Sequence, residues 1–368
     1  MIHAYTNATI FNGTVFVEDH SVIVADNIIQ LVAGNNDLPA DIVTIDCQEH
    51  LLVPAFMDLQ IYGAGGKLFS AFPGPDSLEL LARQNANSGT ANCLVTIATQ
   101  PMDVIEICIE AIKMYWQQGG KGILGMHLEG PFINALKSGA HIKEWMVSPT
   151  PDEVKSLLEK AAGVIKMVTL APECIDPEII PLFVEHGIVV SIGHSNATLA
   201  EANAAFDSGT TTTTHLFNAM SALHHRQPGL PAATMLHPGA TASIIPDGIH
   251  VDYETVRLAK KMMGDRLFFI TDAVTETNSG PYQHVLNTNH YDLPDGTLSG
   301  SALTMLQAVK NAVDHCHISL KEALRMVSLY PARVMRLEQQ YGKIETGFTA
   351  TFALVDRNLS AAIVPGFF

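Results

Sequence analysis

Four side chains that can bind a metal ion or transfer a proton each directly follow a strand-type run of residues. They are Glu129, His194, His215 and Asp272, and the runs before them cover residues 122–128, 188–193, 211–214 and 267–271. Taken alone, a Glu or His at the end of a strand is more often structural, and an Asp there often caps the next helix. Together, one carboxylate and two imidazoles form a ligand set that catalytic zinc sites use while leaving a position open for water. We therefore predict that Glu129, His194 and His215 bind a metal, with Asp272 transferring the proton.

Apolar runs alternate with amphipathic stretches through the middle of the chain, which is the pattern of βαβ units and a parallel sheet. Eight strands are predicted near residues 52–58, 92–98, 122–128, 164–171, 188–193, 210–215, 242–247 and 267–272. Helices are expected at residues 77–87, 151–162 and 253–263, with two more near 302–316 and 319–336. Eight strands favour a (β/α)8 TIM-like barrel, although counting alone does not exclude an open, doubly wound sheet. Barrel enzymes place their active sites at the carboxyl ends of the strands, where the four residues fall.

Both ends of the chain have a different pattern, with short β-type runs separated by Asn, Gly and Asp turn signals. We predict a small antiparallel β-sandwich domain built from both termini, residues 1–52 and 342–368, around a barrel domain at residues 53–341. No low-complexity linker or short-period repeat is present.

The net charge, the cysteines and the apolar stretches of the chain limit its possible binding partners and its location. The 368 residues carry a net charge of −16, which argues against nucleic acid or an anionic membrane because both require a positive surface. Five cysteines without a CxxC pair indicate reduced thiols. No secretory signal and no uninterrupted apolar stretch of about 18 residues occurs, so a soluble, cytoplasmic protein is expected.

Six short motifs carry a resemblance that extends over almost the whole chain. They lie at residues 127–132 (HLEGPF), 193–195 (GHS), 215–220 (HLFNAM), 226–229 (RQPG), 247–250 (DGIH) and 271–273 (TDA). In this order they resemble the N-acetylglucosamine-6-phosphate deacetylases of the amidohydrolase superfamily. The resemblance implies hydrolysis of N-acetyl-D-glucosamine 6-phosphate to D-glucosamine 6-phosphate and acetate, in amino-sugar catabolism. N-acetylgalactosamine 6-phosphate is the alternative substrate, since residues that sense the C4 hydroxyl cannot be identified from one sequence.

One motif departs from the superfamily pattern. After the first barrel strand many amidohydrolases carry His-x-His, whereas Gln60 and Tyr62 occupy those positions here. Neither is a usual zinc ligand, so we predict one divalent metal ion per subunit. Zn²⁺ suits the ligands best, while Fe²⁺, Co²⁺ or Mn²⁺ could use them too. The missing pair also disfavours a dihydroorotase-like enzyme.

Further roles follow from the resemblance. A metal-activated water is expected to attack the amide, with Asp272 as general base and then general acid. The resemblance assigns His141 to the substrate carbonyl and Arg226 and His250 to the phosphate, with the Asn218-Ala219 segment assisting. It also implies a homodimer in which the adjacent subunit supplies part of that pocket.

The other histidines receive no functional role. His127 is expected to face the other side of its strand from Glu129 and to be structural, and His224 and His225 have no assigned role. The rest are expected to be ordinary residues: His3, His20, His50, His186, His237, His284, His290, His315 and His317. A non-catalytic barrel that senses a phosphosugar is the competing functional class, but it would not need Asp272 as a proton shuttle.

Overall fold

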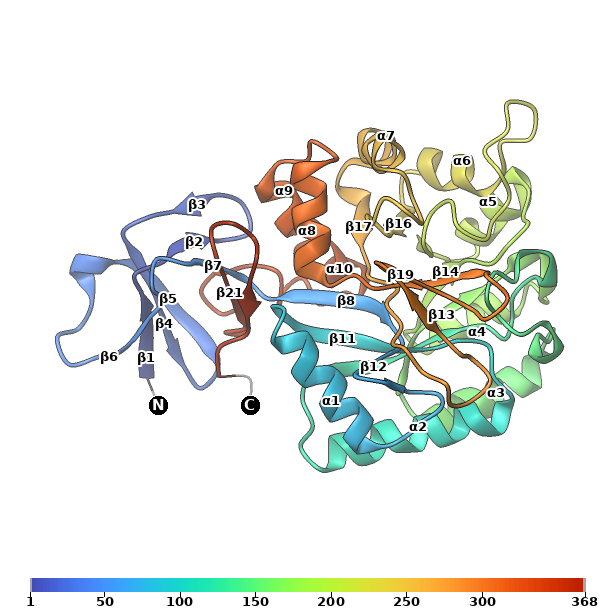
Figure 1. The fold of residues 1–368 in the computed structure, drawn as a ribbon, viewed down its shortest axis with the longest axis horizontal. Helices are drawn as coiled ribbons and strands as arrows, with labels where there is room; N and C mark the ends of the chain where they lie inside the picture. Colours follow the sequence, from blue (N-terminus) through green and yellow to red (C-terminus); the bar gives the residue numbers. More distant parts are fainter. Residues whose placement is uncertain (1, 367–368) are drawn as a thin grey trace. The chain divides into compact units, whose positions relative to one another are not determined.

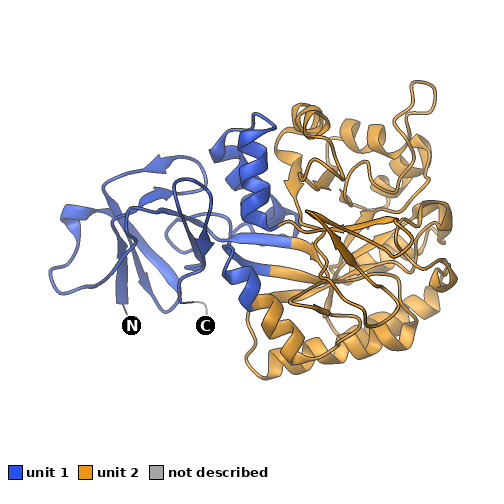
Figure 2. Cartoon of the chain, viewed as in Figure 1, with its two compact units in different colours: residues 1–58, 83–92, 304–368 blue, residues 59–82, 93–303 orange. Residues whose placement is uncertain are grey.

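The computed structural model describes residues 2–366, so Met1, Phe367 and Phe368 of the predicted small domain lie outside the described residues. The chain divides into two compact units (Figure 2). The first comprises residues 1–58, 83–92 and 304–368, and the second comprises residues 59–82 and 93–303. The predicted domain boundaries at residues 52/53 and 341/342 stay predictions.

An eight-stranded parallel sheet forms the centre of the fold (Figure 1). In spatial order its strands are β8 (Phe56–Ile61), β11 (Thr90–Ile97), β12 (Ile123–Glu129), β13 (Ile165–Leu170), β14 (Val189–Ile192), β15 (Thr212–Thr213), β16 (Thr241–Ile244) and β17 (Leu267–Phe269). The spatial order follows the chain order, whereas a doubly wound sheet reverses it. Beyond the two end strands, the Asp272 amide donates to Gln60 O at 2.9 Å and the Tyr62 amide donates to Ala273 O at 2.9 Å. These bonds close the sheet, and the predicted (β/α)8 barrel is confirmed.

Helices follow the strands of the second unit and lie outside them (Figure 1). They are α2 (Met102–Gln117), α3 (Pro151–Ala161), α4 (Ile179–Glu185), α5 (Leu199–Asp207), α6 (Gly229–Leu236) and α7 (Tyr253–Met263), while α1 (Pro75–Ala86) follows β8. Local sequence explains several of their starts. Thr150 and Glu153 form a capping box at α3, and Thr198 and Glu201 form another at α5. The described helices include none long and apolar enough to cross a membrane.

The first unit contains two small sheets. One has the order β5 (Ile28–Gly34), β4 (His20–Ala25), β1 (Ile2–Thr6), β6 (Val43–Asp46), and the other has the order β22 (Ala362–Ile363), β21 (Phe352–Val355), β7 (Leu51–Pro54), β2 (Thr9–Phe11), β3 (Phe16–Val17). Buried Val22, Ile29, Leu52 and Phe352 share one core, so the sheets form a sandwich built from both chain ends. The expected purely antiparallel pairing is wrong, since β1 pairs with β6 and β2 with β7 in parallel. Helices α8 (Met305–Asp314), α9 (Leu320–Met326) and α10 (Leu329–Val334) complete the unit.

The first predicted barrel strand, residues 52–58, merges two strands. The chain changes hydrogen-bond partner at Ala55: the Ala55 amide donates to Thr351 O in the small sheet, and the Phe56 amide donates to Gly89 O. β7 therefore ends at Pro54 and β8 begins at Phe56. Both strands are fully buried, so no polar residue marks the change in the sequence.

A hairpin insertion after β17 was not predicted. It forms an antiparallel sheet of β18 (Val285–Asn287), β19 (His290–Asp292) and β20 (Leu298–Ser301). A second small pairing joins β9 (Gly63–Ala64) to β10 (Lys67–Leu68) after β8. Because these strands are only two to four residues long and β18 is exposed, they lack the buried apolar runs that identified the barrel strands.

Candidate active site

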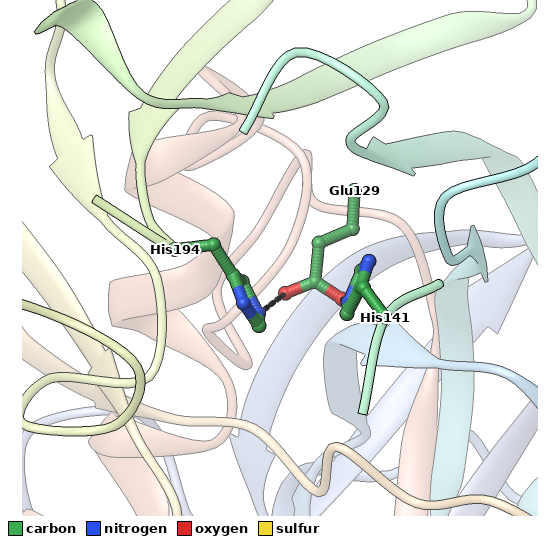
Figure 3. Close-up of side chains that lie close together, drawn as sticks. All are labelled: Glu129, His141 and His194. Atoms are coloured by element: carbon green, nitrogen blue, oxygen red, sulfur yellow. Dashed lines mark ion pairs between the residues drawn. The ribbon is translucent and has the colours of Figure 1, made fainter. Parts of the chain in front are cut away.

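The Glu129 carboxylate lies at the centre of a buried cluster of imidazoles. Its Oε1 atom is 3.0 Å from His215 Nε2 and 3.4 Å from His194 Nε2, and the two Nε2 atoms are 3.1 Å apart. Its other oxygen, Oε2, is 3.4 Å from His141 Nε2. Figure 3 shows the carboxylate between the rings of His141 and His194. Glu129, His141 and His194 each place one possible ligand atom within 4.8 Å of the other two, so this group could hold a metal ion.

Hydrogen bonds on the far side of the rings distinguish two of these imidazoles. His194 Nδ1 is 2.8 Å from the Lys137 carbonyl oxygen, which can only accept, so Nδ1 carries the proton and Nε2 presents a lone pair. His141 has the opposite arrangement, since the Thr99 backbone N–H donates to its Nδ1 at 3.2 Å. A neutral His141 therefore carries its proton on Nε2, the nitrogen that faces the cluster. His194 is prepared to bind a cation, and His141 is prepared to donate a hydrogen bond.

The position taken by a second metal in many amidohydrolases is filled by an amide. Gln60 Nε2 donates to Asp272 Oδ1 at 2.6 Å and to Glu129 Oε1 at 2.9 Å, and lies 3.1 Å from the Tyr62 hydroxyl oxygen. Tyr62 in turn donates its hydroxyl hydrogen to Glu129 Oε2. The amide thus bridges two buried carboxylates and holds Asp272 beside the cluster.

Burial and mutual charge shift the pKa values of these groups. Burial alone would raise the Glu129 pKa, but the contacts with His141, His194 and His215 outweigh burial and hold the pKa well below its usual range. Burial lowers the His141 pKa to about 4, with a further contribution from His194, and burial also lowers the His215 pKa. The Tyr62 pKa is raised by burial and then by the Glu129 charge. An ionised carboxylate beside the neutral imidazole of His215 is the charge state in which metal ligands bind.

The backbone is strained at three of the strand-end residues. His194, His215 and Asp272 have φ values of 47°, 32° and 53°, in the left-handed region that side chains with a Cβ rarely adopt. Such conformations cost about 1–3 kcal/mol each and collect at functional sites. The chain turns sharply at these positions, which brings side chains from separate strands to one point.

A cavity of about 770 Å³, open mouth included, lies next to this cluster within the second unit. Residues with a predicted role that line it are Glu129, His141, His194, His215, Asn218, Ala219, His250 and Asp272. Arg226 is exposed and is not among the lining residues, so its phosphate role stays a prediction.

His250 lines the cavity with both ring nitrogens already engaged. Nδ1 is 2.6 Å from Asp247 Oδ2, and Nε2 is 3.1 Å from the Ser299 carbonyl oxygen. Asp247 also accepts from the His250 amide, and although burial raises its pKa, the His250 contacts outweigh burial and lower it. A phosphate contact by His250 would require one ring nitrogen to change partner.

The expectation for the orientation of His127 was wrong. Residues two apart on a strand share a face, and His127 lies inside the barrel as Glu129 does. Its Nδ1 is 2.9 Å from Leu59 O and its Nε2 is 2.7 Å from Thr169 Oγ1. Both nitrogens are used within the barrel, as expected of a structural residue.

Two supporting residues escaped sequence reasoning. Thr99 sets the hydrogen-bond pattern of His141, as described above. Glu173 holds the segment after His194 by accepting from Asn134 Nδ2 at 2.8 Å and from Ser195 Oγ at 2.7 Å. Glu173 could have been found, because it lies just beyond the predicted strand at residues 164–171. Thr99 directly follows the predicted strand at residues 92–98 and so carried the same signal, but its contact with His141, 42 residues away, could not be predicted.

Comparison with known proteins agrees with this geometry. The amidohydrolase family pattern matches residues 51–366, and the NagA composite domain matches residues 2–52. The N-acetylglucosamine-6-phosphate deacetylase of Haemophilus influenzae is 36% identical, over 97% of this chain and 96% of its own. An N-acetylgalactosamine-6-phosphate deacetylase of Escherichia coli is 29% identical, over 98% of this chain and 96% of its own. The crystal structure of the Pasteurella multocida N-acetylglucosamine-6-phosphate deacetylase superposes with a TM-score of 0.95 at 33% identity, covering 100% of this chain and 99% of that one.

A barrel with this carboxylate and imidazole cluster, matched over most of its length, belongs to the amidohydrolase family. Within that family the chain belongs to the N-acetylglucosamine-6-phosphate deacetylases.

Proposed function

We propose that this chain hydrolyses the acetamide of N-acetyl-D-glucosamine 6-phosphate, releasing acetate and D-glucosamine 6-phosphate. The observation that carries the proposal is the buried Glu129 carboxylate between three imidazoles, with Asp272 held beside it by the Gln60 amide. N-acetylgalactosamine 6-phosphate is not favoured, because relatives named for the gluco substrate reach 36% identity, whereas a relative named for the galacto substrate is 29% identical. A soluble, cytoplasmic enzyme of amino-sugar catabolism fits this role.

Glu129, His194 and His215 would hold one divalent ion, with Zn²⁺ the best match to one oxygen and two nitrogen donors. The fit is supported by the His194 Nε2 lone pair, which lies 3.1 Å from His215 Nε2 and 3.4 Å from Glu129 Oε1, so that the three atoms converge on one point. A cation bound there supplies a water of lowered pKa. The Gln60 amide presents hydrogens where a second metal would need lone pairs, so we infer that the site holds a single ion.

Asp272 and His141 would carry the proton chemistry. Asp272 takes a proton from the attacking water and passes it to the departing amine nitrogen, which is otherwise a poor leaving group. Gln60 steadies this carboxylate through its 2.6 Å bond to Oδ1. His141, with its proton on Nε2, donates to the acyl oxygen as negative charge develops there. A barrel that only sensed phosphosugars would not need this pair.

Phosphate recognition would involve Asn218, Ala219 and His250 of the same chain. Arg226 lies on the exposed segment after Ala219 and could bind phosphate through two of its guanidinium nitrogens. Because Arg226 does not line the cavity of its own chain, we propose that it serves the adjacent subunit of a homodimer.

Acetate release from N-acetylglucosamine 6-phosphate, measured with metal analysis of the purified protein, tests the proposal. We expect turnover that a chelator abolishes and that one equivalent of Zn²⁺ restores. Absence of turnover in both the purified and the metal-supplemented protein would refute the function. Two tightly bound ions per chain would refute the single-metal inference alone.

A further inference from the structure

We propose that His284 determines substrate specificity by accepting a hydrogen bond from a hydroxyl group of the bound sugar. This inference rests on the proposed function, since it concerns how the same cavity recognises an N-acyl amino sugar. His284 lies just before β18 of the hairpin insertion and lines the cavity, yet its side chain takes no part in the chemistry described above.

The hydrogen bonds around His284 define which of its nitrogens carries the proton. The Ser299 hydroxyl donates its single hydrogen to the Tyr291 carbonyl oxygen at 3.0 Å. His284 Nδ1 is 3.0 Å from Ser299 Oγ, which can therefore only accept from it. Nδ1 carries the proton in this bond, and Nε2 of a neutral ring presents a lone pair.

The surroundings keep this ring neutral and fixed in place. His284 is only 5% exposed, and burial lowers its pKa to about 4. Tyr282 lies parallel to the ring at a centroid distance of 6.5 Å, and Tyr291 meets it edge-on at 6.4 Å. An imidazole held in this way has one acceptor in a defined position.

Nε2 of His284 makes no hydrogen bond to any other atom within residues 2–366. The side chain is nearly buried but Nε2 keeps accessible surface, and because His284 lines the cavity, a donor can reach this acceptor from there. Two hydroxyl donors among the cavity residues are engaged elsewhere: Ser299 Oγ donates to Tyr291 O at 3.0 Å, and the Tyr282 hydroxyl donates to Thr99 O at 2.6 Å. We infer that a hydroxyl group of the bound ligand supplies that donor.

The chemistry of the acceptor selects a hydroxyl among the groups of an amino-sugar phosphate. A neutral nitrogen with a lone pair repels phosphate oxygens and the acyl oxygen, which are acceptors themselves. In the proposed reaction the amide N–H would lie at the reacting end beside His141, whereas His284 is a different neighbour of Tyr282, whose ring centroid is 6.5 Å from those of both histidines. The sugar hydroxyls at C1, C3 and C4 are the remaining donors.

Calorimetric binding in an Asp272→Asn background, which separates binding from turnover, tests the assignment. The ligands are N-acetylglucosamine 6-phosphate and its 1-deoxy, 3-deoxy and 4-deoxy analogues, with and without His284→Phe. We expect His284→Phe to weaken the parent sugar about 10-fold, the scale of one neutral hydrogen bond. In the background protein, one deoxy analogue should bind about 10-fold more weakly than the parent sugar. In the His284→Phe protein, the same analogue should bind with the affinity that it has for the background protein.

A matched control is His290→Phe, which changes another histidine of the same hairpin that does not line the cavity. It should bind all four ligands as the background protein does. His284→Gln, which can still place an acceptor near the Nε2 position, should recover part of the affinity and guards against a folding defect in the Phe variant.

Equal losses for all four ligands, or no loss with His284→Phe, would overturn the proposal. Acetate release by the unmodified chain is measured separately. Failure of that assay would reject the proposed function, while the binding series would still decide whether His284 accepts from a sugar hydroxyl.

Discussion

Asp272→Asn separates proton transfer from binding, because the two side chains have nearly the same shape. Asp272 is 7% exposed, and its Oδ1 accepts from Gln60 Nε2 at 2.6 Å. Asparagine can offer its side-chain oxygen to the same amide, so the barrel and the cluster should keep their geometry. What it cannot do is accept the proton of the attacking water and return it to the leaving nitrogen.

General acid and base catalysis contributes about 10²–10⁴-fold, which corresponds to roughly 2.7–5.4 kcal/mol of transition-state stabilisation. We therefore expect kcat for acetate release to fall at least 100-fold, with little change in the dissociation constant for N-acetylglucosamine 6-phosphate. Metal content per chain should stay at that of the unmodified protein, because the expected ligands Glu129, His194 and His215 are untouched.

The assay combines acetate release, calorimetric substrate binding and elemental analysis on the same preparations. Near-normal turnover would remove Asp272 from the mechanism. Loss of the metal together with activity would show that Asp272 is a metal ligand. The assignment of metal binding to Glu129 and of proton transfer alone to Asp272 would then be wrong.

Three further changes test other parts of the structure. Arg266→Ala should lower the free energy of unfolding by about 2–3 kcal/mol, because the guanidinium donates to four backbone carbonyls at and just after the end of α6. Arg266→Lys should not restore this stability, and an unchanged thermal midpoint of the Ala variant would contradict the prediction. Gly193→Ala should weaken metal binding at least 10-fold, since the new Cβ would lie 2.6 Å from Thr169 Cγ2 beside His194; normal metal content under dilute-metal dialysis would refute it. Arg226→Ala should raise KM for phosphorylated substrate while sparing unphosphorylated N-acetylglucosamine, and an equal loss on both would show that it does not bind phosphate.

Several features of the fold were predictable because they depend on local pattern. The barrel strands are buried on both faces and therefore appear as continuous apolar runs, and polar residues at their ends mark the carboxyl edge. The β7–β8 boundary was not predictable, since it is set by a change of backbone partner between Thr351 and Gly89 and not by residue type. The predicted helix at residues 319–336 is two helices, α9 and α10, which end and begin around Val327 and Ser328.

The sequence by itself determined which residues could meet at the end of the barrel: Glu129, His194, His215 and Asp272 each stand at a strand terminus, and parallel strands end on one side of a sheet. Only the tertiary structure decided what each side chain does there. The bond from the Thr99 amide distinguishes His141 from His194, and the hairpin insertion carries His284, which the sequence marked as ordinary, to the cavity wall. The physical reason is that proton positions and polar pairing depend on partners far along the chain, which no local pattern records.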